Sequence, residues 1–198
     1  SSIQVKPAQR VQQGDQLGVM GHTGEGLDKT RAHLHLELNL MLSRQFEAWH
    51  DTFFKTDPNR HGIYNGMNLA GVDIARLYLA LHKRPSLTIP EFLAEEETLY
   101  RVLLPNSHHF DLLKFYPWMA GQEKSETAAS WEVSFNRAGV PLKIRPNAKS
   151  VSEPTLSSMK SSGIDASYLT RGQVAGRGEG AHLTGKGVQF LRLLVFPD

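Results

Sequence analysis

The chain has no cysteine, no long apolar run and no block of charge of one sign, and each absence excludes a class of protein. Without cysteine there are no disulfides and no thiolate metal sites, although histidine and carboxylate sites stay open. The 22 Lys and Arg residues are scattered among 20 Asp and Glu residues, and the net charge of +2 gives no electrostatic footprint for nucleic acid. No apolar run reaches the roughly 18 to 20 residues of a membrane helix, and no signal peptide is evident. We expect neither nucleic-acid binding nor a transmembrane segment.

The composition that remains is that of a globular protein. The chain has 198 residues, of which 40% are hydrophobic and 21% charged. This length suffices for one sizeable core or two small ones. Apolar periodicity and turn residues predict the fold class α+β.

The first part of the sequence is typical of β structure. Glycines punctuate residues 3 to 24, which predicts short strands separated by turns, followed by a loop over 25 to 31. From Ala32 to Leu40 polar and apolar residues alternate without a break. A strand would place His33, His35, Glu37 and Asn39 on one face and four leucines on the other, since its side chains alternate between faces.

A helical pattern follows from about Phe46. Apolar spacing predicts a helix over 69–81, and a capping box of Thr88 and Glu91 predicts a second one reaching about Leu103. A third apolar segment covers 110–119.

The remaining sequence is typical of β structure again. A polar linker over 121–130 leads to a hairpin of 131–135 and 140–144, an exposed loop over 147–163 and a final buried strand over 188–196.

The alternating segment admits two interpretations. Two imidazoles side by side on a rigid strand present a metal ligand and a catalytic neighbour. An ordinary half-buried strand with two solvated histidines has the same pattern, and the alternation alone favours that interpretation.

The glycine-rich segment before it carries a family resemblance. Residues 11 to 24 have the pattern V-x-x-G-x-x-L-G-x-x-G-x-T-G, and His33-Leu34-His35-Leu36-Glu37 follows a short loop later. Together these motifs, which cover about residues 9 to 40, resemble the lysostaphin-type (LytM-like) zinc metallopeptidases. The resemblance implies a hydrolase that cuts peptide bonds of bacterial cell-wall peptidoglycan, in the cell envelope or outside the cell.

The resemblance also implies roles for the two histidines. His35 would be a zinc ligand and His33 the catalytic histidine beside it. A hydrolytic zinc site uses three protein ligands and an open position for water, while a neighbouring imidazole can take a proton. Glu37 could accept a hydrogen bond from a ligand imidazole, although a solvated carboxylate is the simpler role.

The family also uses an H-x-x-x-D ligand pair upstream of these motifs, and no histidine of this chain is followed by aspartate four residues later. The simplest expectation is that residues 1–44 are the C-terminal part of a peptidase domain. A partner segment would then carry its first half. The alternatives are a degenerate member without metal, or ligands from distant residues. Residues 45–120 would form a helical unit and 121–198 a β-rich region of unknown role.

Two other functions stay open. A scaffold that has lost catalysis could bind cell wall or regulate another hydrolase, and the missing ligand pair favours it. A carrier-like β module would need no metal at all.

Three weaker signals have simpler explanations. Residues 180–187 have the G-x-x-x-x-G-K spacing of a phosphate loop but lack the following Ser or Thr, so a glycine-rich turn is favoured. His108 and His109 are adjacent, which suits a helix start better than a ligand pair. Trp118 and Trp131 could line a groove, but core positions are more usual.

Overall fold

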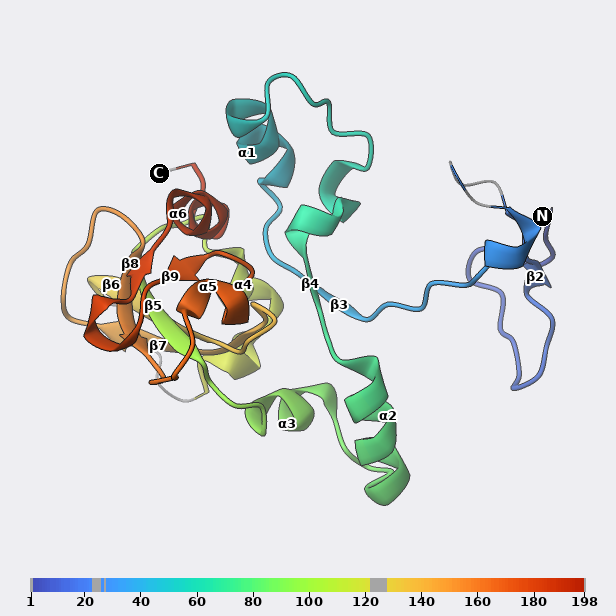
Figure 1. The fold of residues 1–198 in the computed structure, drawn as a ribbon. Coiled ribbons are helices and arrows are strands. Elements are labelled where there is room, and N and C mark those ends of the chain that lie inside the picture. The colour runs from blue at the N-terminus through green and yellow to red at the C-terminus, as the bar shows by residue number, and fades with distance from the viewer. Residues whose placement is uncertain (1, 23–25, 27, 122–127, 198) are drawn as a thin grey trace. The chain divides into compact units, whose positions relative to one another are not determined.

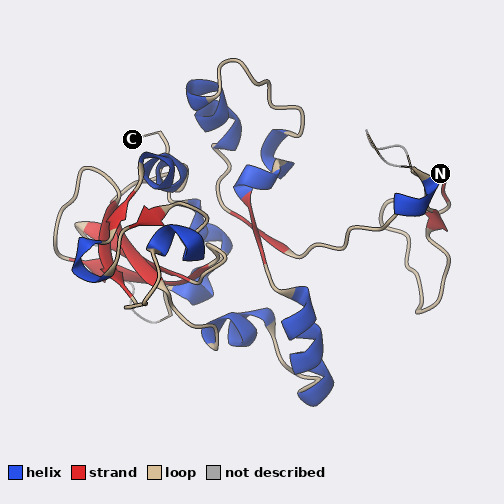
Figure 2. Cartoon of the chain, in the orientation of Figure 1, coloured by secondary structure: helices blue, strands red, loops and turns tan. Residues whose placement is uncertain are grey.

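The computed structural model describes residues 2–22, 26, 28–121 and 128–197. Thr23 and Gly24 of the glycine-rich motif and residues 122–127 of the predicted linker lie outside the described residues. The chain divides into two compact units, Ser1–Glu37 and Leu38–Asp198. Helices and antiparallel sheets are mixed along it, which confirms the α+β class (Figure 2). The expected three-part division at residues 44 and 120 stays a prediction.

The first unit contains very little regular structure. Strands β1 (Ser2–Ile3) and β2 (Gly18–Val19) form a two-residue antiparallel ladder, and η1 (Lys29–Arg31) is a single 3₁₀ turn. A side chain at Gly18 would collide with the carbonyl oxygen of Ser2, so the ladder requires glycine there. The expected short strands over 3 to 24 are therefore present as one small ribbon.

The second unit opens with a strand pair that encloses a helical excursion. Strand β3 (Asn39–Met41) pairs antiparallel with β4 (Leu69–Gly71). Between them the chain forms α1 (Phe46–Phe53), η2 (Gly62–Tyr64) and η3 (Gly66–Asn68). The buried Asn68 side chain donates to the carbonyl oxygens of Ser43 and Ile63, both at 2.8 Å, and fixes this return of the chain.

Two of the predicted helices are shorter than expected. The helix predicted from Leu69 starts only at Ile74, because Leu69–Gly71 pairs with β3 and Asp73 caps α2 (Ile74–Lys83). The capping box of Thr88 and Glu91 is confirmed at the start of α3 (Ile89–Ala94). The predicted continuation to Leu103 is wrong, since Tyr100–Pro105 forms strand β5.

A four-stranded antiparallel sheet is the centre of the second unit (Figure 1). Its order is β7-β6-β5-β8, with β6 at Ser130–Phe135, β7 at Pro141–Asn147 and β8 at Thr155–Met159. Pairing of β6 with β7 confirms the predicted hairpin. The loop predicted over 147–163 is wrong in part, because β8 forms an edge strand inside it.

The final apolar run is a helix and not the predicted strand. After α4 (Asp111–Phe115), η4 (Pro117–Met119), α5 (Ala166–Leu169), β9 (Val174–Ala175), η5 (Gly178–Gly180) and β10 (His182–Leu183), the chain forms α6 (Gly185–Arg192). The Thr184 hydroxyl caps α6 by accepting from the Gly187 amide at 3.0 Å. Gly187 and Leu191, one turn apart, are both buried. An apolar face of helical period therefore replaces the expected strand.

The hydrophobic core joins this sheet to the surrounding helices. On the sheet, Leu104, Val133 and Ile144 are fully buried. The indole of Trp49 in α1 donates to the Gln189 carbonyl oxygen of α6 at 3.1 Å, which connects residues 140 positions apart. The first half of the second unit is thus packed against its last helix.

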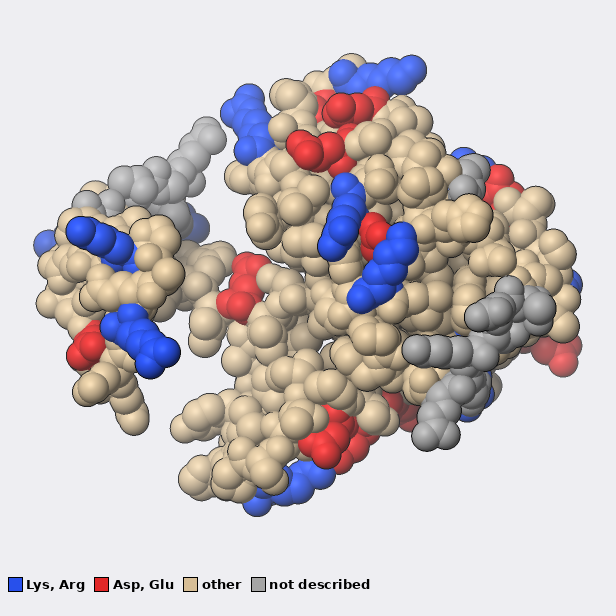
Figure 3. Space-filling model, turned by 180° about the vertical axis from the view of Figure 1, so that it is seen from behind, with Lys and Arg blue, Asp and Glu red and all other residues tan. Residues whose placement is uncertain are grey.

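Charges of both signs are interspersed on the face drawn in Figure 3. Ion pairs of the second unit join Arg84 to Glu95 at 2.7 Å and Arg192 to Glu153 at 2.5 Å. None of the helices in the described part of the chain is long and apolar enough to span a membrane.

Candidate metal centre

The two histidines of the alternating segment are placed by a short capped turn. Asp28 Oδ1 accepts hydrogen bonds from the amides of Thr30 and Arg31, both at 3.0 Å. The same oxygen accepts from the Thr30 hydroxyl at 2.6 Å. These bonds, led by that of the hydroxyl, lower the pKa of Asp28 below its ordinary value. The ionised carboxylate therefore stabilises η1 directly before the histidines.

His33 is held by the carbonyl group at the end of that turn. Its Nδ1 lies 2.8 Å from the carbonyl oxygen of Arg31. A carbonyl oxygen can only accept, so Nδ1 carries the hydrogen and, in the neutral ring, Nε2 keeps its lone pair. The backbone thus selects the tautomer that a metal ligand or general base acting through Nε2 requires.

The two imidazoles converge on one point. His33 Nε2 and His35 Nε2 are 2.6 Å apart, and the rings stack with centroids 4.6 Å apart at 29°. Two nitrogens so close must share a hydrogen or a cation, because two lone pairs facing each other repel. Ligand nitrogens on tetrahedral zinc, with bonds of 2.0–2.1 Å, lie about 3.3 Å apart. The two nitrogens are therefore closer than two ligands of one zinc, and a metal ion on His35 Nε2 requires His33 Nε2 to move away.

Glu37 lies on the other side of His35. Its Oε1 is 3.9 Å from His35 Nδ1, with both side chains largely exposed. A carboxylate behind the non-ligating nitrogen of a metal-bound histidine orients the ring and raises its basicity. The arrangement suits the role expected for Glu37, after a small movement that closes the gap.

The donor set is incomplete within the described residues. Three or more His, Asp or Glu side chains able to hold one metal ion come together nowhere among them. A hydrolytic zinc site needs three protein ligands. His33 and His35 fit part of such a site, and a complete site needs further donors.

The rigid leucine-backed strand expected here is wrong. Residues 32–38 form no ladder among the described residues, and β3 covers only Asn39–Met41. Leu34 and Leu36 are 83% and 74% exposed. Their alternation is real, but no strand pairs with residues 32–38 among the described residues, so backbone pairing does not continue through the histidines.

Exposed apolar side chains are general in the first unit. Ile3, Val11, Leu17, Val19 and Met20 are all exposed. None of its described residues is buried. A unit of this size cannot stabilise itself without burying apolar surface, so these side chains mark a surface that suits a packing partner.

The other sequence signals resolve into structural roles. Trp131 is a core residue, and its indole donates to Asn106 Oδ1 at 3.0 Å. The His109 amide donates to the Ser107 hydroxyl at 2.9 Å, in the turn before α4. A helix does follow the glycine-rich segment 180–187, contrary to expectation. There the Lys186 ammonium donates to the carbonyl oxygen of Arg171 at 3.3 Å.

Sequence reasoning missed the groups that orient His33. The Arg31 carbonyl oxygen has no sequence signature, because every residue supplies such an oxygen. Asp28, however, could have been recognised as a cap, since aspartate before a turn commonly accepts from the amides two and three residues later.

Comparison with known proteins finds no relative. No family model, curated protein or solved structure matches this chain. The function is therefore argued from the residues alone.

Proposed function

We propose that the chain contributes His33 and His35 to a zinc metallo-endopeptidase that hydrolyses peptide bonds of bacterial cell-wall peptidoglycan. In this proposal His35 is a zinc ligand and His33 the catalytic histidine. The substrate class, and a location in the cell envelope or outside the cell, follow from the motif resemblance of residues 9 to 40.

One observation carries the proposal. The Nε2 atoms of His33 and His35 meet at 2.6 Å, and the Arg31 carbonyl oxygen 2.8 Å from His33 Nδ1 leaves that ring's Nε2 as the reactive nitrogen. This convergence puts both imidazoles within reach of one bound ion and its water.

Each of the three side chains has a separate role in the proposed hydrolysis. His35 holds the metal through Nε2 while Glu37, 3.9 Å from its Nδ1, orients the ring. Zinc bound there supplies Lewis acidity and lowers the pKa of water to about 7. His33 takes a proton at Nε2, and the Arg31 carbonyl stabilises the charge that the imidazolium then carries at Nδ1.

The remaining ligands would come from a partner segment that carries the first half of the domain. The exposed apolar side chains of the first unit support this part of the proposal. They include Ile3, Leu34 and Leu36, which a second sheet would cover.

The experiment uses the protein in its full natural length, loaded with zinc, and purified peptidoglycan peptides. We expect hydrolysis that a chelator abolishes. His35→Ala should lose both zinc and activity. His33→Ala should keep zinc and lose activity by about 10²-fold or more, the usual contribution of a general base. Full zinc occupancy without any hydrolysis would contradict the proposal.

A second candidate is a catalytically degenerate scaffold that binds cell wall or regulates another hydrolase. The observation that favours it is the incomplete donor set among the described residues. Elemental analysis separates the two candidates, because stoichiometric zinc favours the enzyme and its absence, together with retained cell-wall binding, favours the scaffold.

A further inference from the structure

A cavity of about 430 Å³ lies inside the second unit, between α1, the segment of η3 and β4, the β6–β7 turn and α6. One side of it is apolar. That side is formed by Trp49, Phe54, Met67, Leu69 and Phe190. Cavities of roughly 300–1,000 Å³ with apolar walls and a few polar groups are typical small-molecule sites.

Another part of the lining presents hydrogen-bond donors, from Arg171, Gln173 and Lys186. Gln173 Oε1 accepts from the Tyr100 hydroxyl at 2.7 Å. Burial raises the pKa of Tyr100 far above its ordinary value, so the phenol keeps its proton and stays a donor. The amide oxygen of Gln173 is thereby occupied, and its NH₂ group is left for the cavity that Gln173 lines.

Arg171 lines the same side from an unusual backbone conformation. Its φ is +55°, a left-handed value that costs energy for any residue with a Cβ. The carbonyl oxygen of Arg171 accepts from the Lys186 ammonium at 3.3 Å, which brings a second cation to the wall. Among the described residues nothing hydrogen-bonds to or pairs with the Arg171 guanidinium. Arg171 therefore brings to the cavity an exposed cation that has no ion-pair partner among the described residues.

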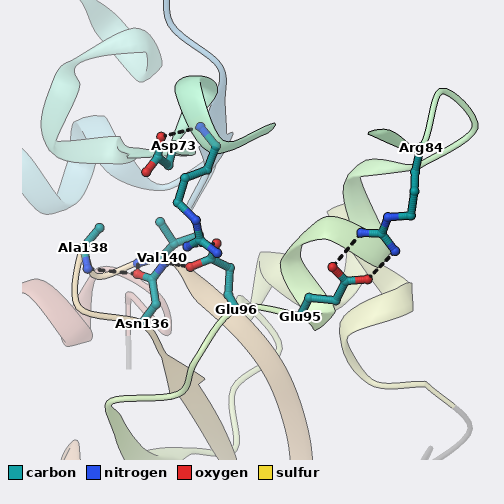
Figure 4. A network of polar contacts seen from close by, with 8 residues as sticks. Asp73, Arg84, Glu95, Glu96, Asn136, Ala138 and Val140 are labelled. Carbon is teal, nitrogen blue, oxygen red and sulfur yellow. Dashed lines mark hydrogen bonds and ion pairs between the residues drawn. The ribbon is translucent and has the colours of Figure 1, made fainter. Parts of the chain in front are cut away.

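No acidic residue balances these cations among the described residues that line the cavity. The neighbouring cavity of about 610 Å³, which shares Arg171 and Ala138 with it, is different. There Glu96 pairs with Arg76 at 2.6 Å and accepts from Asn136 at 3.4 Å (Figure 4). The smaller cavity thus combines apolar side chains with two cations and, among its described lining residues, no carboxylate.

We propose that this cavity binds a small apolar monocarboxylate. The apolar body would lie against Trp49 and Phe190, and the carboxylate would accept from Arg171, Lys186 and the amide of Gln173. Charge-assisted hydrogen bonds to a desolvated carboxylate are stronger than neutral ones. The site is separate from His33 and His35 and does not depend on the proposed peptidase activity.

Isothermal titration calorimetry of the whole chain with decanoate, below its micelle concentration, tests the proposal. We expect saturable binding with one site. Shortening the chain to octanoate should weaken affinity by about fourfold for each methylene removed, the value for burying a CH₂ group. Decanol, which has the same body without charge, should bind at least about tenfold more weakly.

Two variants test the polar wall. Arg171→Gly removes the guanidinium and suits the backbone, since glycine adopts positive φ freely, so the fold is retained. Lys186→Gln removes the second cation. Each should weaken decanoate about tenfold. Lys149→Gln, which changes net charge equally away from the cavity, should leave affinity unchanged.

Three results would overturn the proposal. They are the absence of saturable decanoate binding, equal affinity for decanol, and unchanged decanoate affinity in Arg171→Gly that retains the wild-type circular dichroism spectrum.

Discussion

His33 Nε2 lies 2.6 Å from His35 Nε2, and the carbonyl oxygen of Arg31 lies 2.8 Å from His33 Nδ1. These two contacts fix the orientation of the His33 ring, because each involves one of its nitrogens. The backbone holds one end of the first imidazole, and the second imidazole is aligned with its other end. In the proposed metal centre, these three groups within five residues would form the reactive part.

Removing the cap of the preceding turn should loosen this pair. Asp28→Ala takes away the acceptor for the amides of Thr30 and Arg31, so the carbonyl that orients His33 loses its fixed position. We expect a fall in zinc affinity of several-fold to about tenfold, within the range for groups that orient a ligand. Competition with a zinc-binding dye measures it. Asp15→Ala, in another exposed turn of the same unit, is the control. Equal affinity in the Asp28 variant would contradict this role.

The capping box of α3 should contribute measurably to the stability of the second unit. Thr88→Ala removes the hydroxyl that caps Glu91, and loss of such a cap costs about 1 kcal/mol. Urea denaturation followed by tryptophan fluorescence measures the change. Ser86→Ala, an exposed position two residues earlier, should change the free energy of unfolding by less than about 0.5 kcal/mol. Equal effects of the two substitutions would count against the cap.

The centre of the sheet should be much more sensitive than its surroundings. Leu104 in β5 is fully buried, so Leu104→Ala should lower the free energy of unfolding by about 2–5 kcal/mol through lost burial and the cavity left behind. Leu79 in α2 is 60% exposed, and Leu79→Ala should cost far less. Chemical denaturation of both variants provides the comparison. If residues 100–105 were helical and exposed, the two substitutions would lower the free energy of unfolding equally.

Asp165 should make stability depend on pH at the acid end. Its carboxylate accepts from the Ser167 hydroxyl at 2.7 Å and the Ser167 amide at 2.9 Å, and these bonds lower its pKa. The stabilisation is complete above the unfolded pKa of about 4 and is lost as pH falls through the lower folded value. Asp165→Asn should therefore be less stable than wild type at pH 7, with the difference shrinking towards pH 3. A difference that is constant with pH would exclude this cause.

Local signals in the sequence predicted the elements that local chemistry determines. The capping box at Thr88 and Glu91 and the β6–β7 hairpin were both predicted correctly, because a cap and a turn are decided by residues close in sequence. The fold class followed from the same patterns.

Elements that tertiary packing decides were missed. The sequence predicts a helix up to about Leu103, whereas Tyr100–Pro105 forms strand β5 because it pairs with β6 and β8, which follow later in the chain. Strand β8 has serines at its exposed positions, which is the composition of a loop as well as of an edge strand. The apolar run from Val188 is compatible with either a strand or a buried helix. The Thr184 cap favours the helix, because its hydroxyl accepts from an amide of the first turn.

In the candidate site, too, the sequence predicts what nearby residues determine and misses what tertiary contacts determine. The sequence pattern was sufficient to bring His33 and His35 to one side of an extended segment. It did not predict that Leu34 and Leu36 would be exposed, because that depends on a partner surface. The contact between the two rings, and the contact of His33 with the Arg31 carbonyl, depend on side-chain conformations that the sequence pattern does not specify.

The measurement that tests the central claim most directly is a zinc titration of the protein in its full natural length, followed by ¹⁵N NMR of the imidazole nitrogens. His182 is an internal control, since its Nδ1 also lies 3.0 Å from the carbonyl oxygen two residues earlier, and among the described residues it contacts no second histidine. The account predicts that zinc shifts His35 Nε2 to the position of a metal-bound nitrogen, leaves His182 unchanged, and has no such effect in His35→Ala. Equal shifts at His35 and His182, or none at His35, would contradict it.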